Sequence, residues 1–288
     1  MIIGTFRTHH PESHGRKEKM GKRWYICRLP VLCFILTALS LFAGCAPTAQ
    51  QKAKPTFIPA DKNVLRVGIT AESPPLIYKQ NHKIVGLEAD FARDLAEYLG
   101  KSLRFIELEW EDQISALLEN RIDIIMSGMS VTAMREVRIA FTISYFESGQ
   151  MALIRRQDAP RFSAGLFSFA TSSAIGVVKD TTGEYYVETQ FSSVKRIAYT
   201  EPRAAVKDLI DNDIDMFIYD APMVLYLASE NENRGLTVLF ALLTKEPLAW
   251  GIRKDNVELL DSANNFLQTL NKEGKLNKII KYWIPFAK

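Results

Sequence analysis

Short apolar runs alternate with amphipathic segments from Val64 to the end of the chain. Apolar runs of five or six residues predict buried strands, and apolar positions three and four residues apart predict helices with one buried face. This alternation is typical of βαβ units and a mostly parallel sheet. The first half is predicted to contain strands 64–69, 103–108 and 122–126 with helices 88–99 and 111–120, and the second half strands 174–178, 195–199 and 214–218 with helices 183–191 and 201–211.

Two segments outside this alternation, 150–156 and 247–253, are predicted to cross between two lobes. Two closing helices, 257–270 and 276–283, are predicted to return the chain to the first lobe. We therefore predict an α/β fold of two lobes, each a mostly parallel sheet flanked by helices, joined by two crossover strands that bend as a hinge. Lobe 1 is predicted to comprise residues 62–151 and 250–288, and lobe 2 residues 152–249.

One segment of the chain occurs twice. Residues 117–128 (LLENRIDIIMSG) return 92 positions later as residues 209–220 (LIDNDIDMFIYD), with four identities in twelve positions. The alternative is a chance recurrence of a common helix and strand pattern. Ligands bind outside the carboxyl ends of strands in open α/β sheets. The repeat therefore predicts that Ser127 and Gly128 of one lobe and Tyr219 and Asp220 of the other face a shared cleft.

The first 44 residues have the pattern of an export signal: a basic flank, an apolar run at 29–43 that is too short to span a bilayer comfortably, and small residues before Cys45. This segment resembles a lipoprotein signal, which implies lipidation of Cys45; the alternative is an uncleaved membrane anchor. Met20 is a candidate true start. Residues 45–61 are rich in Ala, Pro, Gln and Lys and are predicted to be a flexible tether. Either reading places the bulk of the chain outside the cytoplasm.

Charge and reactive side chains exclude several classes of function. The whole chain carries a net charge of +3, but loss of residues 1–44 leaves 29 basic and 31 acidic side chains, or about −2. No basic patch argues for nucleic acid. His82 and Cys45 are the only histidine and cysteine beyond residue 44, so no disulfide, metal site, cofactor or catalytic residue is predicted.

Candidate binding residues follow the first copy of the repeat. A short helix is predicted to begin near Thr132, and the backbone N–H groups of a helix start can hold a carboxylate. Arg135 adds a guanidinium that meets a carboxylate with two hydrogen bonds. The alternatives are that Arg135 pairs with Glu136 or Glu147 on the surface and that Thr132 only caps the helix.

The second copy of the repeat ends in an acidic residue. Asp220 is placed to bind an ammonium group, or else to cap the helix that Pro222 starts. The segment 178–184 (VKDTTGE) is a predicted strand followed by a turn of small residues into a helix, which is a second arrangement able to accept an anion.

Taken together, these pieces resemble the extracellular solute-binding proteins that serve polar amino acid ABC importers. The resemblance covers the chain from Val64 onward and implies the two-lobed type II periplasmic-binding-protein fold and a monomer that delivers its ligand to a membrane permease. The matching pieces, in order, are Leu65-Arg-Val-Gly68, Pro74-Pro75, Gly86-Leu-Glu-Ala-Asp90, Ser127-Gly-Met-Ser-Val-Thr-Ala-Met-Arg135, Phe141, Ser144-Tyr145, Thr182-Gly-Glu184, Tyr219-Asp220-Ala-Pro222, Gly274 and Trp283.

The resemblance also implies a site for a small zwitterion. Arg135, Ser130 and Thr182 would hold the ligand α-carboxylate. Asp220 and the carbonyl of Gly128 would hold the α-ammonium. The residue matching the aromatic of the family's pocket is Trp110, whose alternative is an ordinary buried aromatic.

The chain departs from the family pattern in its first loop. Ser73 stands where many members carry an aromatic residue, and Tyr78 is the candidate substitute. Thr70 stands where binders of cationic side chains often carry an acid, which weakens the case for a lysine or arginine ligand.

Two other functions fit such lobes. One is a periplasmic enzyme similar to cyclohexadienyl dehydratase. The other is a sensor that presents its ligand state to a membrane kinase or chemoreceptor.

Overall fold

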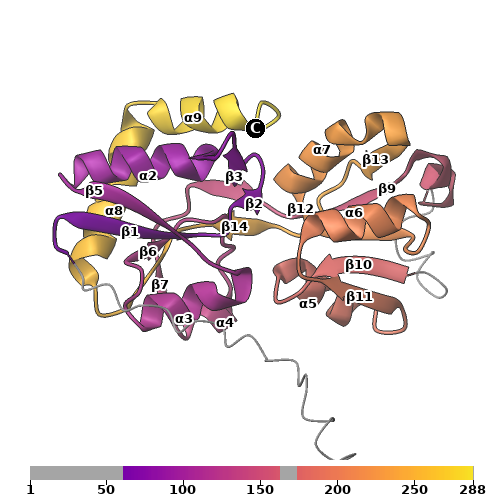
Figure 1. The fold of residues 1–288 in the computed structure, drawn as a ribbon, viewed down its shortest axis with the longest axis horizontal. Coiled ribbons are helices and arrows are strands. Elements are labelled where there is room, and N and C mark those ends of the chain that lie inside the picture. Colours follow the sequence, from indigo (N-terminus) through magenta and orange to yellow (C-terminus); the bar gives the residue numbers. More distant parts are fainter. Residues whose placement is uncertain (1–60, 163–173, 288) are drawn as a thin grey trace, which may run out of the picture. The chain divides into compact units, whose positions relative to one another are not determined.

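The computed structural model describes residues 61–162 and 174–287. The predicted signal segment, Cys45 and the tether up to residue 60 lie outside the described residues. The described chain forms two five-stranded sheets with helices on both faces (Figure 1). The strand orders are β5-β1-β6-β15-β7 and β11-β10-β12-β9-β13. The two-lobed α/β prediction is therefore confirmed.

The first sheet is built from Val64 to Phe141 and is completed late in the chain. Its strands are β1 (Val64–Ile69), β5 (Ser102–Glu107), β6 (Ile124–Ile125), β7 (Ala140–Phe141) and β15 (Gly251–Ile252). A small three-stranded sheet, β2 (Glu72–Ser73), β3 (Ile77–Gln80) and β4 (Lys83–Val85), follows β1. The helices of this lobe are α2 (Leu87–Tyr98), η1 (Trp110–Asp112), α3 (Gln113–Leu118), α4 (Ala133–Glu136), α8 (Val257–Lys272) and α9 (Lys275–Trp283).

The second sheet repeats this plan. Its strands are β9 (Gln150–Arg155), β10 (Ala174–Val178), β11 (Lys195–Tyr199), β12 (Met216–Asp220) and β13 (Leu236–Leu239). Its helices are η2 (Arg156–Phe162), α5 (Thr182–Gln190), α6 (Pro202–Ile210), α7 (Ala221–Glu230) and η4 (Glu232–Arg234). In each sheet one strand runs against the other four, β15 in the first and β9 in the second. The prediction of mostly parallel sheets holds for both.

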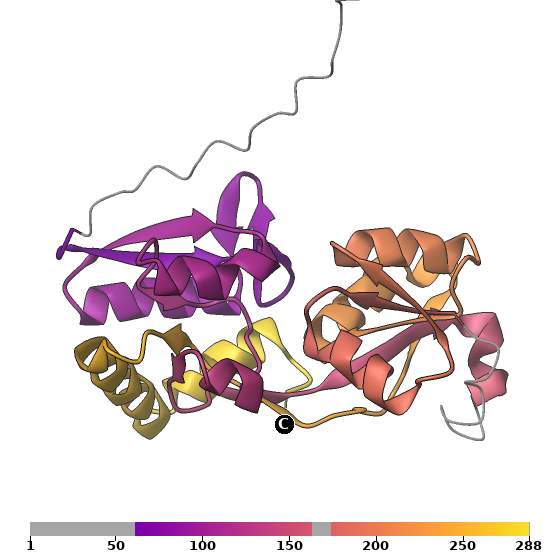
Figure 2. The same cartoon turned by 90° about the horizontal axis from the view of Figure 1, so that it is seen from below.

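The crossovers lie earlier in the chain than the sequence suggested. The chain passes between the sheets along β8 (Phe146–Ser148) and β14 (Glu246–Leu248), which pair with each other, and Figure 2 shows these two extended segments between the lobes. The prediction of segment 150–156 as a crossover is wrong, because Gln150–Arg155 is the buried strand β9 inside the second sheet. Its apolar character comes from burial between β12 and β13. The predicted segment 247–253 covers most of β14 and all of β15.

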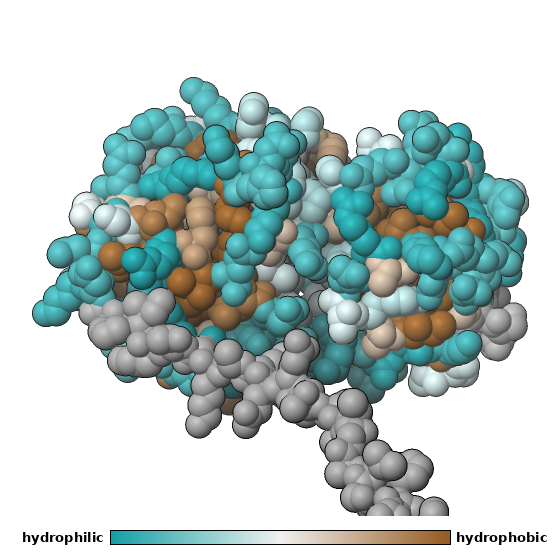
Figure 3. Space-filling model, in the orientation of Figure 1, coloured by the Kyte–Doolittle hydropathy of each residue, from teal (hydrophilic) through white to brown (hydrophobic). Residues whose placement is uncertain are grey.

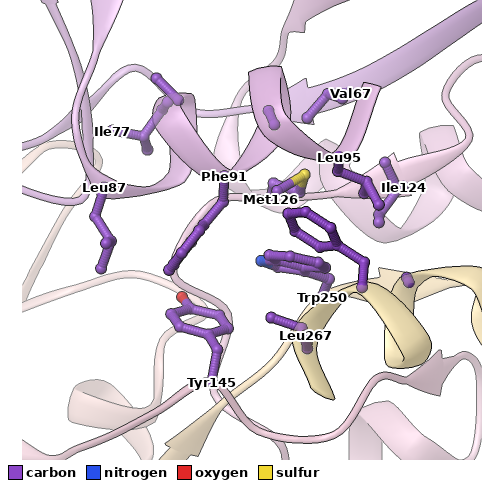
Figure 4. Close-up of a cluster of buried hydrophobic side chains, with 14 of the residues drawn as sticks. Val67, Ile77, Leu87, Phe91, Leu95, Ile124, Met126, Tyr145, Trp250 and Leu267 are labelled. Atoms are coloured by element: carbon purple, nitrogen blue, oxygen red, sulfur yellow. The ribbon is translucent and has the colours of Figure 1, made fainter. Parts of the chain in front are cut away.

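Both sheets are buried on both faces, which explains the continuous apolar runs of their central strands. Side chains alternate along a strand, so Ile124 of β6 enters the core beneath α2 and α8 while its neighbour Ile125 packs against α3. The larger core surrounds Trp250, which contacts Phe91 edge to face and the tilted ring of Tyr145 (Figure 4). The two closing helices join this core, as predicted.

Within the described residues no helix combines the length and apolarity needed to cross a bilayer. Hydrophilic residues cover much of the face seen in Figure 3, with groups of hydrophobic residues visible between them.

Candidate functional site

A pocket lies at the carboxyl ends of β6 and β12, the two strands of the sequence repeat. Both strands hold the third place in their sheets, next to β1 and β10. The pocket is lined from both lobes, by Thr70, Glu72, Ser73, Leu76, Trp110, Ser127, Gly128, Ser130 and Arg135 on one side and by Val178, Thr181, Thr182, Thr200, Pro202, Tyr219 and Asp220 on the other. All six predicted ligand-binding residues therefore lie around one pocket.

The loop after β6 is held from beneath by a buried carboxylate. Glu88 of α2 is fully buried and accepts the backbone N–H of Gly128 at 2.8 Å, the Tyr145 hydroxyl at 2.6 Å and the Trp250 indole N–H at 2.8 Å. Burial raises the pKa of Glu88, although all three hydrogen bonds act in the opposite direction. These contacts fix the left-handed backbone of Gly128, whose φ is 69°. No sequence pattern predicted this role of Glu88, although the segment around it matches the family.

Arg135 projects from α4 into the pocket. The Thr132 hydroxyl accepts the Arg135 N–H at 3.3 Å, so Thr132 is the helix cap that the sequence predicted. The guanidinium donates to the Ser130 carbonyl at 2.8 Å and makes no ion pair with Glu136 or Glu147 in the described part of the chain. The surface-pair alternative for Arg135 is therefore not what the structure shows.

Several neighbouring groups interact with the positive charge of Arg135. Its guanidinium carbon lies 5.2 Å from the centre of the Trp110 ring, within the range of a cation–π contact. Shielding from water lowers the pKa of Arg135, while the carboxylates of Asp220 and Glu246 raise it. A guanidinium stays charged in such surroundings. Arg135 thus supplies a fixed, partly desolvated positive charge.

Trp110 joins the two lobes. Its indole N–H donates to the carbonyl of Asp180, in the loop after β10, at 2.9 Å. The ring lines the pocket and is only partly buried, so Trp110 is not an ordinary core aromatic. The sequence suggested Trp110 as the aromatic residue of the ligand pocket. In the structure its ring also contacts the Arg135 guanidinium.

Asp220 stands at the N-terminus of α7 but does not cap it. No side-chain cap bond is made there, and the carboxylate instead accepts the Gln150 amide at 2.6 Å. Shielding from water raises the pKa of Asp220 to about 7, helped by the Glu246 carboxylate and opposed by Gln150 and Arg135. The helix-cap alternative for Asp220 is therefore set aside by the geometry.

Thr182 is the first residue of α5, where Thr181 caps the helix. Its hydroxyl donates to Glu246 at 2.8 Å and accepts the Gln150 amide at 3.0 Å. The Ser130 hydroxyl donates to the same Glu246 oxygen at 2.6 Å. Sequence reasoning missed Gln150 and Glu246, because both lie in or beside the crossover strands and no motif marks them.

The first-loop residues behave differently from expectation. Tyr78 does not line the pocket; it packs near Tyr226 and Trp283, with ring centres 6.4 Å apart in both pairs. Ser73 lines the pocket, and its side chain acts to lower the pKa of Tyr219 of the opposite lobe. Thr70 is tied into lobe 1 by donating to the Leu108 carbonyl at 3.0 Å. Tyr78 is therefore not a substitute for the missing aromatic.

An acidic residue that the sequence analysis passed over lies in the same loop. Glu72 lines the pocket, and its pKa is raised by shielding from water and then by the carboxylates of Glu201 and Glu109. No ion pair or hydrogen bond of the Glu72 side chain is found among the described residues. The positive charges of Lys79 and Arg203 act in the opposite direction, so this end of the pocket is lined by a carboxylate with both acidic and basic side chains nearby.

The chain is similar in sequence to known proteins. The family model of the bacterial extracellular solute-binding proteins, family 3, matches residues 65–286. The ABC transporter arginine-binding protein 1 of Escherichia coli (strain K12) is 27% identical over 234 residues, which cover 80% of this chain and 94% of the relative.

Solved structures share the fold. An ancestral arginine-binding protein bound to arginine has a TM-score of 0.73 and 28% identity, covering 77% of this chain and 99% of that one. The ancestral amino acid-binding protein AncCDT-1, a precursor of cyclohexadienyl dehydratase, has a TM-score of 0.70 and 28% identity, covering 77% and 95%. Because the family model spans most of the sequence, the chain belongs to the bacterial extracellular solute-binding proteins, family 3.

Proposed function

We propose that this solute-binding protein captures a free amino acid between its lobes and delivers it to the permease of an ABC importer. The observation that carries the proposal is the placement of Arg135 and Asp220 in one pocket, each supplied by a different lobe. A guanidinium suits an α-carboxylate, and a carboxylate suits an α-ammonium. The relatives' names support an amino acid as the ligand.

The division of charge between the lobes gives the ligand a mechanical role. A zwitterion loses its hydration in the pocket, so both of its ends need charged or hydrogen-bonded partners. With the Arg135 and Ser130 donors on one lobe and the Asp220 acceptor on the other, only the closed arrangement satisfies both ends. To shift closure from 1:99 to 99:1, the ligand must bind the closed form roughly 10⁴-fold more tightly. A permease that recognises the closed lobes thereby recognises a loaded protein.

The side-chain end of the pocket favours a cation. Glu72 offers a carboxylate at the rim, with Glu109 and Glu201 nearby and Lys79 and Arg203 acting in the opposite direction, and Trp110 offers an aromatic surface. A cationic side chain would offset the mutual repulsion of these carboxylates. We therefore rank arginine and lysine above glutamine, although Thr70 lacks the acid often found at its position in such binders.

Export and anchoring complete the proposal. Residues 1–44 are proposed to be the cleaved signal, and Cys45 to carry the lipid anchor. The tether is proposed to connect this anchor to the lobes at the outer side of the membrane, where the protein acts as a monomer. Labelling of the protein with a radioactive fatty acid in wild-type cells, and its loss in Cys45→Ala, tests the anchor.

Titration calorimetry with the twenty amino acids tests the function. Wild type should bind at least one of them, and Arg135→Ala and Asp220→Ala should both lose that binding. Comparing L-arginine with L-citrulline, which replaces the guanidinium by a neutral group of similar shape, tests the cationic preference. A folded wild-type protein that binds none of the twenty would contradict the proposal.

The similarity to a precursor of cyclohexadienyl dehydratase makes that enzyme the second candidate. Incubation with prephenate or arogenate distinguishes the two functions. We expect no phenylpyruvate or phenylalanine, and formation of either product in proportion to the protein would favour the enzyme. A deletion that leaves amino acid uptake intact would favour a sensor over an importer component.

A further inference from the structure

Glu246 is a buried carboxylate that belongs to neither sheet. It is the first residue of the crossover strand β14, and only 8% of its surface is exposed. Its position between the lobes brings it into contact with side chains from both. A buried carboxylate needs hydrogen-bond donors in place of the water that it has lost, and Glu246 has four of them.

The donors to Glu246 are residues of the proposed binding site. Its Oε2 atom accepts the hydroxyls of Ser130, from lobe 1, at 2.6 Å and of Thr182, from lobe 2, at 2.8 Å, with the Gln150 amide at 3.4 Å. Its Oε1 atom accepts the Thr244 hydroxyl at 2.6 Å. The positive charge of Arg135 also acts on Glu246, because the Glu246 carboxylate is one of the charges that raise the pKa of Arg135.

The chemistry of a hydroxyl makes these contacts exclusive. Serine and threonine each carry one O–H proton, so a hydroxyl that donates to Glu246 does not donate to a second carboxylate. Ser130 and Thr182 are the two hydroxyls proposed for the α-carboxylate of the ligand. The Glu246 carboxylate therefore already takes up the donors, and part of the charge, that the ligand needs.

We infer that Glu246 is an internal competitor for the α-carboxylate site and sets the affinity of the protein for its amino acid. The inference rests on the proposed function. To bind, the ligand carboxylate must draw the Ser130 and Thr182 hydroxyls away from Glu246, and the repulsion between two carboxylates near Arg135 opposes its entry. This competition acts on the α-carboxylate, so it is the same for every amino acid that binds.

Replacing Glu246 tests the competition. Glu246→Gln keeps the shape and removes the charge, and Glu246→Asp keeps the charge but is one methylene too short to reach both hydroxyls. Titration of both variants with L-arginine, L-lysine, L-glutamine and L-cystine should show affinities about tenfold tighter than wild type for each amino acid that binds. The matched control is Glu147→Gln, because Glu147 lies opposite β14 in β8, is exposed and pairs with Lys245. The affinity of Glu147→Gln for each amino acid should equal that of wild type.

The opposite result overturns the inference. Unchanged or weaker binding in Glu246→Gln would show that Glu246 supports the ligand, as a partner of its ammonium or as a fixed part of the site. A tightening confined to one amino acid would show a side-chain effect and would also count against competition. If wild type and Glu147→Gln, both folded by thermal melting, bind no amino acid, the proposed function fails and this inference fails with it.

Discussion

The two lobes contain the same turn, but the residues that follow this turn carry opposite charges into the pocket. In each, a helix leads through an asparagine with positive φ, Asn120 at 58° and Asn212 at 69°, into the third strand of the sheet. Three residues later an aspartate accepts a backbone N–H of the neighbouring strand at 2.8 Å: Asp123 accepts from Arg66 of β1 and Asp215 from Ala174 of β10. The repeat in the sequence is therefore a structural repeat.

The shared isoleucine has a packing role in both copies. A Cβ added at Gly68 would lie 2.3 Å from the Ile122 side chain, and one added at Gly176 would lie 2.6 Å from the Ile214 side chain. Each glycine thus makes room for the isoleucine that fixes the helix to the sheet. The residues that recur 92 positions apart are those that build the turn.

The residues beyond the turn do not recur. The first copy ends in Ser127 and Gly128 and continues to α4, which supplies Arg135, whereas the second copy ends in Asp220 and enters α7 directly. One lobe therefore presents a cation and the other an anion on nearly identical scaffolds. The residues shared by the two copies therefore build the fold, while the residues that differ place opposite charges in the pocket.

The largest expected effect is on the stability of the first lobe. Arg66 is buried and pairs with Asp123 at 2.7 Å while donating to the Asn120 carbonyl at 2.7 Å. Arg66→Met should lower the free energy of unfolding by about 3 to 5 kcal/mol, because a buried pair loses one partner. Arg104→Met, an exposed neighbour in register on β5, is the control for urea denaturation. Equal stability of the two variants would contradict the role given to Arg66.

The next effect is on ligand binding by the cationic lobe. Arg135→Ala should weaken binding of the best amino acid by at least about 100-fold, since a charge-assisted contact to the carboxylate is lost. Arg138→Ala removes an exposed arginine three residues away and should bind as wild type does. Calorimetry at constant salt measures both, and a similar loss in both variants would count against a specific site.

A smaller effect tests the packing of the repeat. Gly68→Ala and Gly176→Ala should each destabilise the protein by about 1 to 3 kcal/mol, because the added methyl group meets the isoleucine side chain. Adding Ile122→Val to the first variant and Ile214→Val to the second should recover part of the loss, since both remove the Cδ1 atom in question. Thermal denaturation compares single and double variants. A double variant that is less stable than the corresponding Gly→Ala single variant would show that this contact does not cause the loss of stability.

The smallest effect is a pH dependence from the anionic lobe. The pKa of Asp220 is raised to about 7 in the ligand-free pocket, and an ammonium ligand favours the ionised carboxylate. Binding must therefore release a proton below pH 7, so the affinity should fall by up to about tenfold per pH unit as the pH drops below 7 and stay level above it. Calorimetry in buffers of different ionisation enthalpy counts the released protons. The absence of proton release on binding at pH 6 would contradict a raised pKa of Asp220 in the ligand-free protein.

The sequence predicted the elements closely, because apolar periodicity reflects burial on one or two faces. Strands β1, β10 and β11 begin and end as predicted. The prediction from the sequence was wrong for segment 150–156, because a strand buried inside a sheet and an apolar crossover have the same pattern. The paired strands β8 and β14 carry few apolar residues and gave no such signal.

The site was predicted where it follows strand ends and missed where it depends on the hinge. Arg135, Asp220, Ser130, Thr182, Gly128 and Trp110 meet around one pocket, while their roles toward a ligand stay predictions. Glu246 reaches the site through the pairing of the crossover strands β14 and β8, and Gln150 through the pairing of β9 with β12. Local patterns encode neither of these long-range pairings. The role of Glu88 beneath Gly128 likewise depends on long-range packing.

A crystal structure with the tightest-binding amino acid would show both ends of the ligand at once. We expect the α-carboxylate within about 3 Å of the Arg135 guanidinium and the α-ammonium within about 3 Å of the Asp220 carboxylate, in the same bound molecule. A ligand bound outside this pocket, or held by only one of the two residues, would contradict this expectation.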